Sequence, residues 1–167
     1  MSEEVPKKKQ TSLGLYVTAQ EAYEMWKDNP EKINILDVRT PEEYYFVGHA
    51  EMARNIPVGF VKYQWNSEKK EPVFVPNPDF MTSMKVCFGT DDKLLIMCRS
   101  GGRSALTVNA LAEAGFSNTY NIIDGMEGDM VKDQNSPENG KRMKNGWKNA
   151  GLPWTYDINP ELLWIST

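Results

Sequence analysis

The stretch from Leu94 to Ser104 constrains the fold of this 167-residue chain more than any other part of its sequence. Leu94–Cys98 is an unbroken apolar run, which is typical of a central strand in a parallel sheet. The five residues that follow, Arg-Ser-Gly-Gly-Arg, cannot continue that strand, and a largely apolar helix restarts at about Ser104. A buried strand that leads into a buried helix through a short loop predicts an α/β fold.

Strand and helix signals on both sides of this unit support the same fold class. The capping box Thr18–Glu21 opens a helix that ends before Pro30. Thr40–Glu43 carries an N-cap residue, a proline and a glutamate in the positions that start a second helix. Short runs rich in β-branched or apolar residues predict strands at 33–38, 53–56 and 119–123.

The chain divides into a domain and three less regular parts. Residues 1–14 are polar and charged, so we expect a flexible tail in which Lys7–Lys9 is solvated. The domain spans 15–130 and contains an insert at 59–92, which we expect to be irregular apart from one helix that begins near Asp79. Residues 131–167 form a C-terminal extension, and its late aromatic residues predict that it packs on the domain.

Composition excludes several classes of function. Its 23 acidic residues outnumber 19 lysines and arginines, so the net charge of −4 provides no basic field for nucleic acid. One histidine and two cysteines cannot form a four-ligand zinc site or a disulfide framework. The apolar runs are far shorter than the ~20 residues of a spanning helix, so we expect no membrane partner. The N-terminus lacks an apolar signal core, which predicts a cytoplasmic protein, although a removed export signal would leave the same pattern.

Cys98 and the loop after it carry the chemistry. In a parallel sheet, ligands bind beyond the carboxyl ends of the strands, which is where this loop must lie. Gly101 and Gly102 permit positive φ and close backbone approach, so successive N–H groups can turn toward an anion. The helix N-terminus and the charges of Arg99 and Arg103 add positive potential. These features favour a nucleophilic thiolate and an anionic substrate.

Four motifs in this chain resemble those of the single-domain rhodanese family, the thiosulfate sulfurtransferases, and occur in the family's order. The resemblance covers residues 15–130 and rests on Ile35–Arg39, Gly48–Ala50 with Asn55–Pro57, the Cys98–Ser104 loop, and Asn121–Met126. It implies a five-stranded parallel sheet flanked by helices on both faces. One departure is that Gly125–Asp129 replaces the family's usual Gly-Gly followed by Trp.

The resemblance also implies a reaction. Cys98 attacks the outer sulfur of thiosulfate or a persulfide, becomes a persulfide itself, and passes that sulfur to cyanide, a thiol or a protein acceptor. The loop binds the small anionic donor through Arg99, Ser100, Gly101, Gly102, Arg103 and Ser104. We expect supporting roles for Asp37, Arg39 and His49, with the first two bracing the loop. No metal or organic cofactor is required, because the transferred sulfur is carried on the protein.

Other functions remain open at this point. Phosphatase and arsenate reductase loops have five residues between cysteine and arginine, whereas four separate Cys98 from Arg103, so they fit less well. A protease dyad would need His49 as base, and a packing role suits that residue better. A regulatory or sulfur-carrier module is the main alternative, but such silent domains lack the cysteine. The helical spacing of Cys87 with apolar neighbours favours a packed thiol over a redox partner for Cys98.

Overall fold

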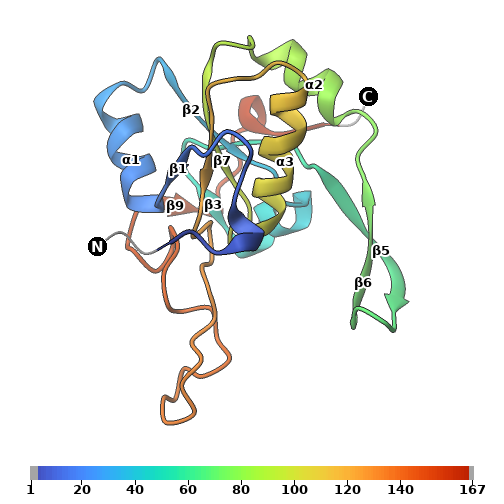
Figure 1. The fold of residues 1–167 in the computed structure, drawn as a ribbon, viewed down its shortest axis with the longest axis vertical. Helices are drawn as coiled ribbons and strands as arrows, with labels where there is room; N and C mark the ends of the chain where they lie inside the picture. The colour runs from blue at the N-terminus through green and yellow to red at the C-terminus, as the bar shows by residue number, and fades with distance from the viewer. Residues whose placement is uncertain (1–3, 166–167) are drawn as a thin grey trace.

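Five parallel strands form the central sheet of the computed structural model, which describes residues 4–165 (Figure 1). The strand order is β1-β8-β7-β2-β4, and every neighbouring pair in this sheet is parallel. The α/β fold and the five-stranded parallel sheet predicted from the sequence are therefore confirmed. The strands are β1 (Tyr16–Val17), β2 (Ile33–Asp37), β4 (Arg54–Asn55), β7 (Lys93–Met97) and β8 (Thr119–Ile122).

Helices cover both faces of the sheet because the strand side chains alternate between two apolar clusters. From β7, Leu95 and Met97 enter the cluster that packs beneath α1 (Ala19–Asp28). Ile96 and Cys98 point the other way, into the cluster beneath α2 (Phe80–Cys87) and α3 (Gly102–Glu113). Cys98 thus lies on the α3 side of the sheet, directly before the loop that leads into α3.

Local signals explain where the first helices begin and end. Thr18 accepts a hydrogen bond from the backbone N–H of Glu21, and the Glu21 carboxylate accepts one from Thr18, which is the predicted capping box of α1. The second predicted helix begins at Pro41 and continues as the π-helical segment η2 (Glu43–Val47). Gly48, at a φ of 98°, ends it.

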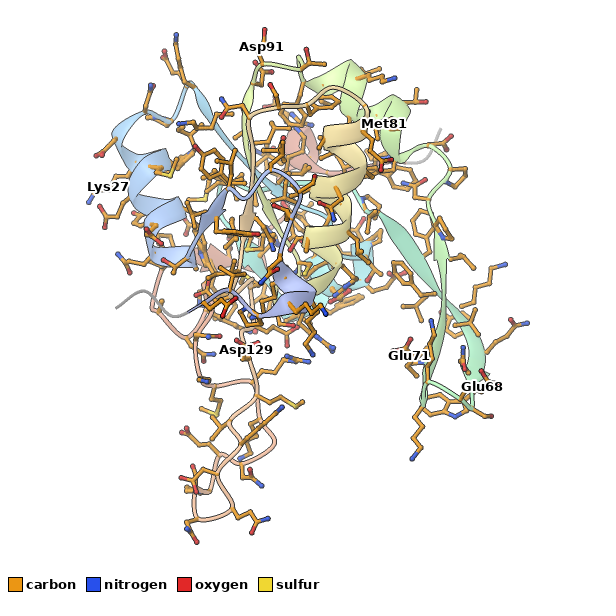
Figure 2. All side chains as sticks on the ribbon, viewed as in Figure 1. Lys27, Glu68, Glu71, Met81, Asp91 and Asp129 are labelled. Carbon is orange, nitrogen blue, oxygen red and sulfur yellow. The ribbon has the colours of Figure 1, made fainter. Side chains whose placement is uncertain are left out.

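The insert is more regular than the sequence suggested. Gly59–Asn66 (β5) and Glu71–Pro76 (β6) form an antiparallel hairpin, which projects from the body of the molecule (Figure 1). Figure 2 places Glu68 and Glu71 at its far end. The prediction of one helix in this insert is right, since α2 follows the hairpin, but the prediction that the rest is irregular is wrong. A two-stranded hairpin tolerates the prolines of β6 because its outer edge needs no N–H donors.

Cys87 and Lys9 also differ from expectation. Cys87 is an exposed free thiol, because the buried face of α2 ends with Met84 and it is Phe88 that packs against the core. Lys9 lies in the short 3-10 helix η1 (Lys7–Lys9) and is only 6% exposed, so the prediction of a solvated lysine run is wrong at this position. Residues 1–3 of the predicted tail lie outside the described residues.

The C-terminal extension contributes to the core beneath α1. Trp147 is fully buried there and Leu152 nearly so. Trp154–Thr155 (β9) pairs antiparallel with His49–Ala50 (β3). In the sequence between β8 and Trp147, residues 130–146 form a long loop that projects from the body in Figure 1. The 3-10 helix η3 (Pro160–Leu162) lies near the C-terminal end of the chain. Across residues 4–165, no helix is both long and apolar enough to cross a membrane.

Candidate active site

Cys98 occupies the position immediately after β7, and its side chain is 1% exposed. The backbone N–H of Gly101 donates a hydrogen bond to its Sγ over 3.1 Å. The Ser104 hydroxyl lies 3.3 Å from the same sulfur. The loop therefore curls back over the nucleophile, and the first turn of α3 faces it, so the positive end of the helix dipole favours negative charge at this sulfur.

The two loop glycines have different roles. Gly101 has a φ of 101°, and a Cβ placed on it would lie 2.5 Å from the carbonyl oxygen of Ile123. Gly102 is already helical and has no atom within 4 Å of such a Cβ. The two properties expected from the sequence for both glycines, a positive φ and a close backbone approach, are therefore found at Gly101 and not at Gly102. The helix begins at Gly102, two residues earlier than predicted, so Ser104 is not its cap.

Ser104 and Asn121 form a buried polar pair behind Cys98. Their side-chain oxygens are 2.6 Å apart, and both residues are fully buried. The Asn121 amide nitrogen donates to the carbonyls of Lys9 and Gly101, which fixes its oxygen toward Ser104. Asn121 thus ties β8 to the loop, and sequence reasoning assigned it no role. A polar residue inside the apolar strand 119–123 was the signal that could have revealed it.

Lys9 supports the loop from outside. Its Nζ donates to the Ile123 carbonyl over 2.7 Å and forms an ion pair with Asp129 at 2.9 Å. Figure 2 shows Asp129 at the root of the projecting loop, beside η1. The Cδ atom of Lys9 lies 3.1 Å from the position that a Cβ on Gly101 would take, so the aliphatic stem covers the turn.

Arg103 is held by a carboxylate. Its two terminal nitrogens donate to the two carboxylate oxygens of Glu43 over 2.6 and 2.8 Å. Burial by itself raises the pKa of Glu43, but the hydrogen bond and charge of Arg103, helped by Arg39, outweigh it and lower that pKa. The Glu43–Arg103 pair therefore links the start of α3 to η2, and the Glu43 carboxylate neutralises the Arg103 charge. The sequence had assigned that charge to donor binding.

Glu43→Gln is expected to destabilise the protein in a pH-dependent way. The pKa of Glu43 is lowered on folding, so the pair stabilises the protein above the ordinary value of 4.5, and the effect fades as pH falls through the lowered pKa. Because both side chains are partly exposed, we expect a loss of about 1–2 kcal/mol at neutral pH. Urea unfolding of both proteins above and below pH 4.5 measures this, and a difference that stays constant would contradict it.

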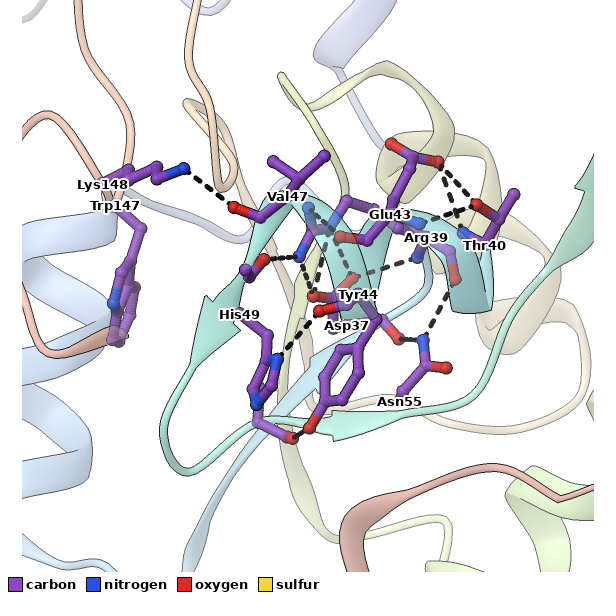
Figure 3. A network of polar contacts seen from close by, with 12 residues as sticks. Asp37, Arg39, Thr40, Glu43, Tyr44, Val47, His49, Asn55, Trp147 and Lys148 are labelled. Atoms are coloured by element: carbon purple, nitrogen blue, oxygen red, sulfur yellow. Dashed lines mark hydrogen bonds and ion pairs between the residues drawn. The ribbon is translucent and has the colours of Figure 1, made fainter. Parts of the chain in front are cut away.

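Asp37 and Arg39 brace η2 from the end of β2 (Figure 3). Both side chains are fully buried, and their closest atoms are 2.7 Å apart. The same guanidinium donates to the carbonyls of Gly48 and Glu43, over 2.8 and 3.5 Å. Burial lowers the pKa of Arg39, but the Asp37 carboxylate more than compensates and raises it, so the guanidinium stays charged. The brace therefore fixes Glu43, which in turn holds Arg103.

His49 takes a packing position. Its ring stacks on Tyr44 with the centroids 3.8 Å apart, and its Nδ1–H donates to the Tyr44 carbonyl over 2.9 Å. The ring is 2% exposed, and the Tyr44 hydroxyl continues the network to the Ala53 carbonyl (Figure 3). The described polar and stacking contacts of the His49 side chain are thus with η2 and not with Cys98.

Arg99 and Ser100 form the exposed side of the loop. Arg99 is exposed, and Ser100 is half-buried. The Arg99 guanidinium finds no hydrogen-bonding or ion-pair partner among residues 4–165. The Arg99 carbonyl accepts hydrogen bonds from the N–H groups of Glu127 and Gly128 over 3.0 and 3.1 Å. The Arg99 backbone is therefore fixed while its charge stays available.

Comparison with known proteins identifies the family. The model of the rhodanese-like domain matches residues 18–130, well over half of the chain. The chain belongs to the rhodanese-like family. Among curated relatives, the uncharacterized protein RP600 of Rickettsia prowazekii is 32% identical over 73% of this chain and 82% of its own. Thiosulfate sulfurtransferase 16 of Arabidopsis thaliana is 38% identical over 54% of this chain and 68% of its own.

A solved structure extends the comparison beyond the matched domain. The crystal structure of Rv0390 from M. tuberculosis has a TM-score of 0.64 with 28% identity, and the match covers 84% of this chain and 96% of that one. The likeness thus includes part of the chain outside residues 18–130. The matched domain of residues 18–130 includes Cys98 and the loop after β7.

Proposed function

We propose that this rhodanese-like protein is a sulfurtransferase that carries a sulfane sulfur on Cys98. The observation that carries the proposal is the N–H of Gly101 directed at the Cys98 sulfur, within a loop that opens α3. A ring of backbone donors at a helix N-terminus stabilises a charged sulfur without needing a side-chain base. The relative named thiosulfate sulfurtransferase supports thiosulfate as the first donor to test.

The proposed reaction has two balanced steps. The Cys98 thiolate attacks the outer sulfur of thiosulfate, a sulfur–sulfur bond forms, and sulfite leaves with the electron pair of the bond that breaks. The product is the persulfide anion of Cys98. Cyanide or another thiophilic acceptor then attacks the terminal sulfur, forms a new bond to it, and returns the Cys98 thiolate. Since the transferred atom stays on the protein, neither step calls on a metal or an organic cofactor.

Each site residue has a role in this scheme. The backbone N–H groups of the loop stabilise the thiolate and then the terminal sulfur of the persulfide. Arg99 supplies unpaired positive charge for the donor, whereas Arg103 is a positioning residue because Glu43 holds it. Ser104 reaches the nucleophile from α3, and Asn121 keeps its hydroxyl in place. Asp37 and Arg39 act through the brace.

Thiocyanate production from thiosulfate and cyanide tests the proposal. Cys98→Ser is expected to lower turnover by about 10³-fold or more, because the nucleophile is removed. Cys87→Ser, which changes an exposed thiol, is expected to retain wild-type turnover. Turnover that survives in Cys98→Ser would contradict the proposal. A wild-type protein that transfers no sulfur from thiosulfate, polysulfide or an organic persulfide would instead support a regulatory module.

A further inference from the structure

Arg39, Arg99, Arg103 and Arg142 differ in whether a carboxylate matches their charge. Arg39 is paired with Asp37 and Arg103 with Glu43, both within salt-bridge distance. Arg99 and Arg142 have no carboxylate at that distance among residues 4–165. A donor anion that approaches Cys98 therefore meets unmatched positive charge from Arg99 and Arg142. The charges of Arg39 and Arg103 are already matched by their carboxylates.

Arg142 comes from the projecting loop of the C-terminal extension, 44 residues after Cys98 in the sequence. Its Nη1 donates to the Gly128 carbonyl over 2.9 Å, and the N–H of Gly128 donates to the Arg99 carbonyl over 3.1 Å. Two consecutive hydrogen bonds thus connect the Arg142 guanidinium to the residue beside the nucleophile. The other N–H groups of this guanidinium have no acceptor within residues 4–165, so they can take a ligand.

The segment that presents Arg142 is held in place. Asn149 donates to the carbonyls of Arg142 and Asn145 over 3.0 and 2.7 Å. A Cβ on Gly146 would lie 2.6 Å from the backbone nitrogen of Gly128, so the extension packs tightly against the segment after β8. A Cβ on Gly128 would in turn collide with the carbonyl group of Asn145, which explains the second glycine of Gly125–Asp129, where the sequence departs from the usual family pattern.

The charges around Arg142 support a site for an anion. Burial lowers the pKa of Arg142, and repulsion from the nearby Arg99 charge lowers it further, against the opposing effects of Glu127, Asp129 and Cys98. Asp129 is engaged by Lys9 and Asn145, which leaves Glu127 as the nearby carboxylate without a described partner. Two positive charges that repel one another gain stability when an anion binds between them.

We propose that Arg142 and Arg99 form an anion subsite beside Cys98, which binds the oxygen-bearing end of a small dianionic sulfur donor such as thiosulfate. The inference rests on the proposed function for its choice of ligand, but the subsite itself depends only on charge and position. The C-terminal extension would then take part in donor recognition, which the resemblance of residues 15–130 does not imply. Charge-assisted hydrogen bonds from a guanidinium suit planar or tetrahedral oxyanions.

A pair of alkylating reagents tests the subsite without requiring sulfur transfer. Iodoacetate and iodoacetamide react with a thiolate in the same way, but only iodoacetate is an anion. In a Cys87→Ser background, Arg142→Gln is expected to lower the rate of Cys98 alkylation by iodoacetate about three- to tenfold. The rate with iodoacetamide is expected to fall much less, since that reagent is neutral and reports only the effect of the lost charge on the Cys98 thiolate. Lys141→Gln removes an exposed cation from the same loop and is the matched control, with both rates unchanged.

The outcomes separate the subsite from the proposed function. A ratio of iodoacetate to iodoacetamide rates that is equal in wild type and Arg142→Gln would overturn the subsite, as would an equal fall in Lys141→Gln. A lower ratio in Arg142→Gln, restored in part by Arg142→Lys, supports it even if the protein transfers no sulfur. In a protein that does transfer sulfur, kcat/KM with thiosulfate is expected to fall by a similar factor, mainly through KM.

Discussion

Replacing Gly101 by alanine is expected to lower the rate of Cys98 persulfide formation by at least about 100-fold. The added Cβ would collide with the Ile123 carbonyl at 2.5 Å, and the backbone would have to leave its φ of 101°, which strains any residue with a side chain. Either adjustment moves the N–H that donates to the Cys98 sulfur. Stopped-flow measurement of sulfite release from thiosulfate records the effect.

Gly102→Ala is the matched control for this prediction. Gly102 has helical backbone angles and open space around its Cβ position, and alanine has the higher helix propensity. We therefore expect near wild-type sulfite release and a slightly higher melting temperature. Similar activity in the two variants would show that the Gly101 turn does not position the donor N–H groups. Circular dichroism of both proteins separates a lost loop geometry from a lost fold.

Arg39→Met is expected to cost about 3–5 kcal/mol of the free energy of unfolding. The change leaves the Asp37 carboxylate without its partner at a position where both side chains are fully buried. It also removes the donors to the carbonyls of Gly48 and Glu43, which hold η2 against the end of β2. Urea unfolding at neutral pH measures the loss. We expect sulfur transfer to fall as well, because Glu43 and Arg103 lose their support.

The double variant Asp37→Asn/Arg39→Met tests the cause of that loss. With the carboxylate neutralised, no uncompensated charge is buried, so the double variant is expected to be more stable than Arg39→Met alone. Some destabilisation remains because the two backbone carbonyls still lack their donor. A double variant that is less stable than the single one would show that packing, and not buried charge, dominates at this site.

The sequence predicted the frame of the molecule because its signals are local. Apolar runs of four or five residues, each followed by a helix start, are sufficient to indicate parallel strands with crossovers. The place of Cys98 after β7 follows from the same pattern, since Arg99 to Gly102 cannot extend a buried strand. The capping box at Thr18 also depends on residues only three apart. None of these features depends on a contact between residues far apart in the chain.

The rest could not be predicted because it depends on residues far apart in the chain. Lys9 is buried only because Ile123 and Asp129, more than a hundred residues later, offer it acceptors. Arg103 has the sequence context of an anion-binding arginine, but the position of Glu43 decides its partner. The hairpin is a different case, since residues 61–66 alternate strictly between apolar and polar side chains. That signal was present, and the nearby prolines obscured it.

These long-range contacts give the two loop arginines different roles. Arg103 is tied through Glu43 to the buried brace at the end of β2, so it positions the start of α3. Arg99 keeps its charge exposed beside the projecting loop of the extension. In the proposed subsite, Arg142, which lies outside the matched domain of residues 18–130, adds its charge to that of Arg99.

The mass of the intact protein after incubation with thiosulfate tests the central claim most directly. Removal of excess donor by rapid desalting leaves only sulfur that is bound to the protein. We predict that the wild type and Cys87→Ser gain the mass of one sulfur atom, that cyanide removes this mass, and that Cys98→Ala gains nothing. A stable gain in Cys98→Ala, or an unchanged wild-type mass with every sulfane donor tried, would contradict the assignment of Cys98 as the carrier of the transferred sulfur.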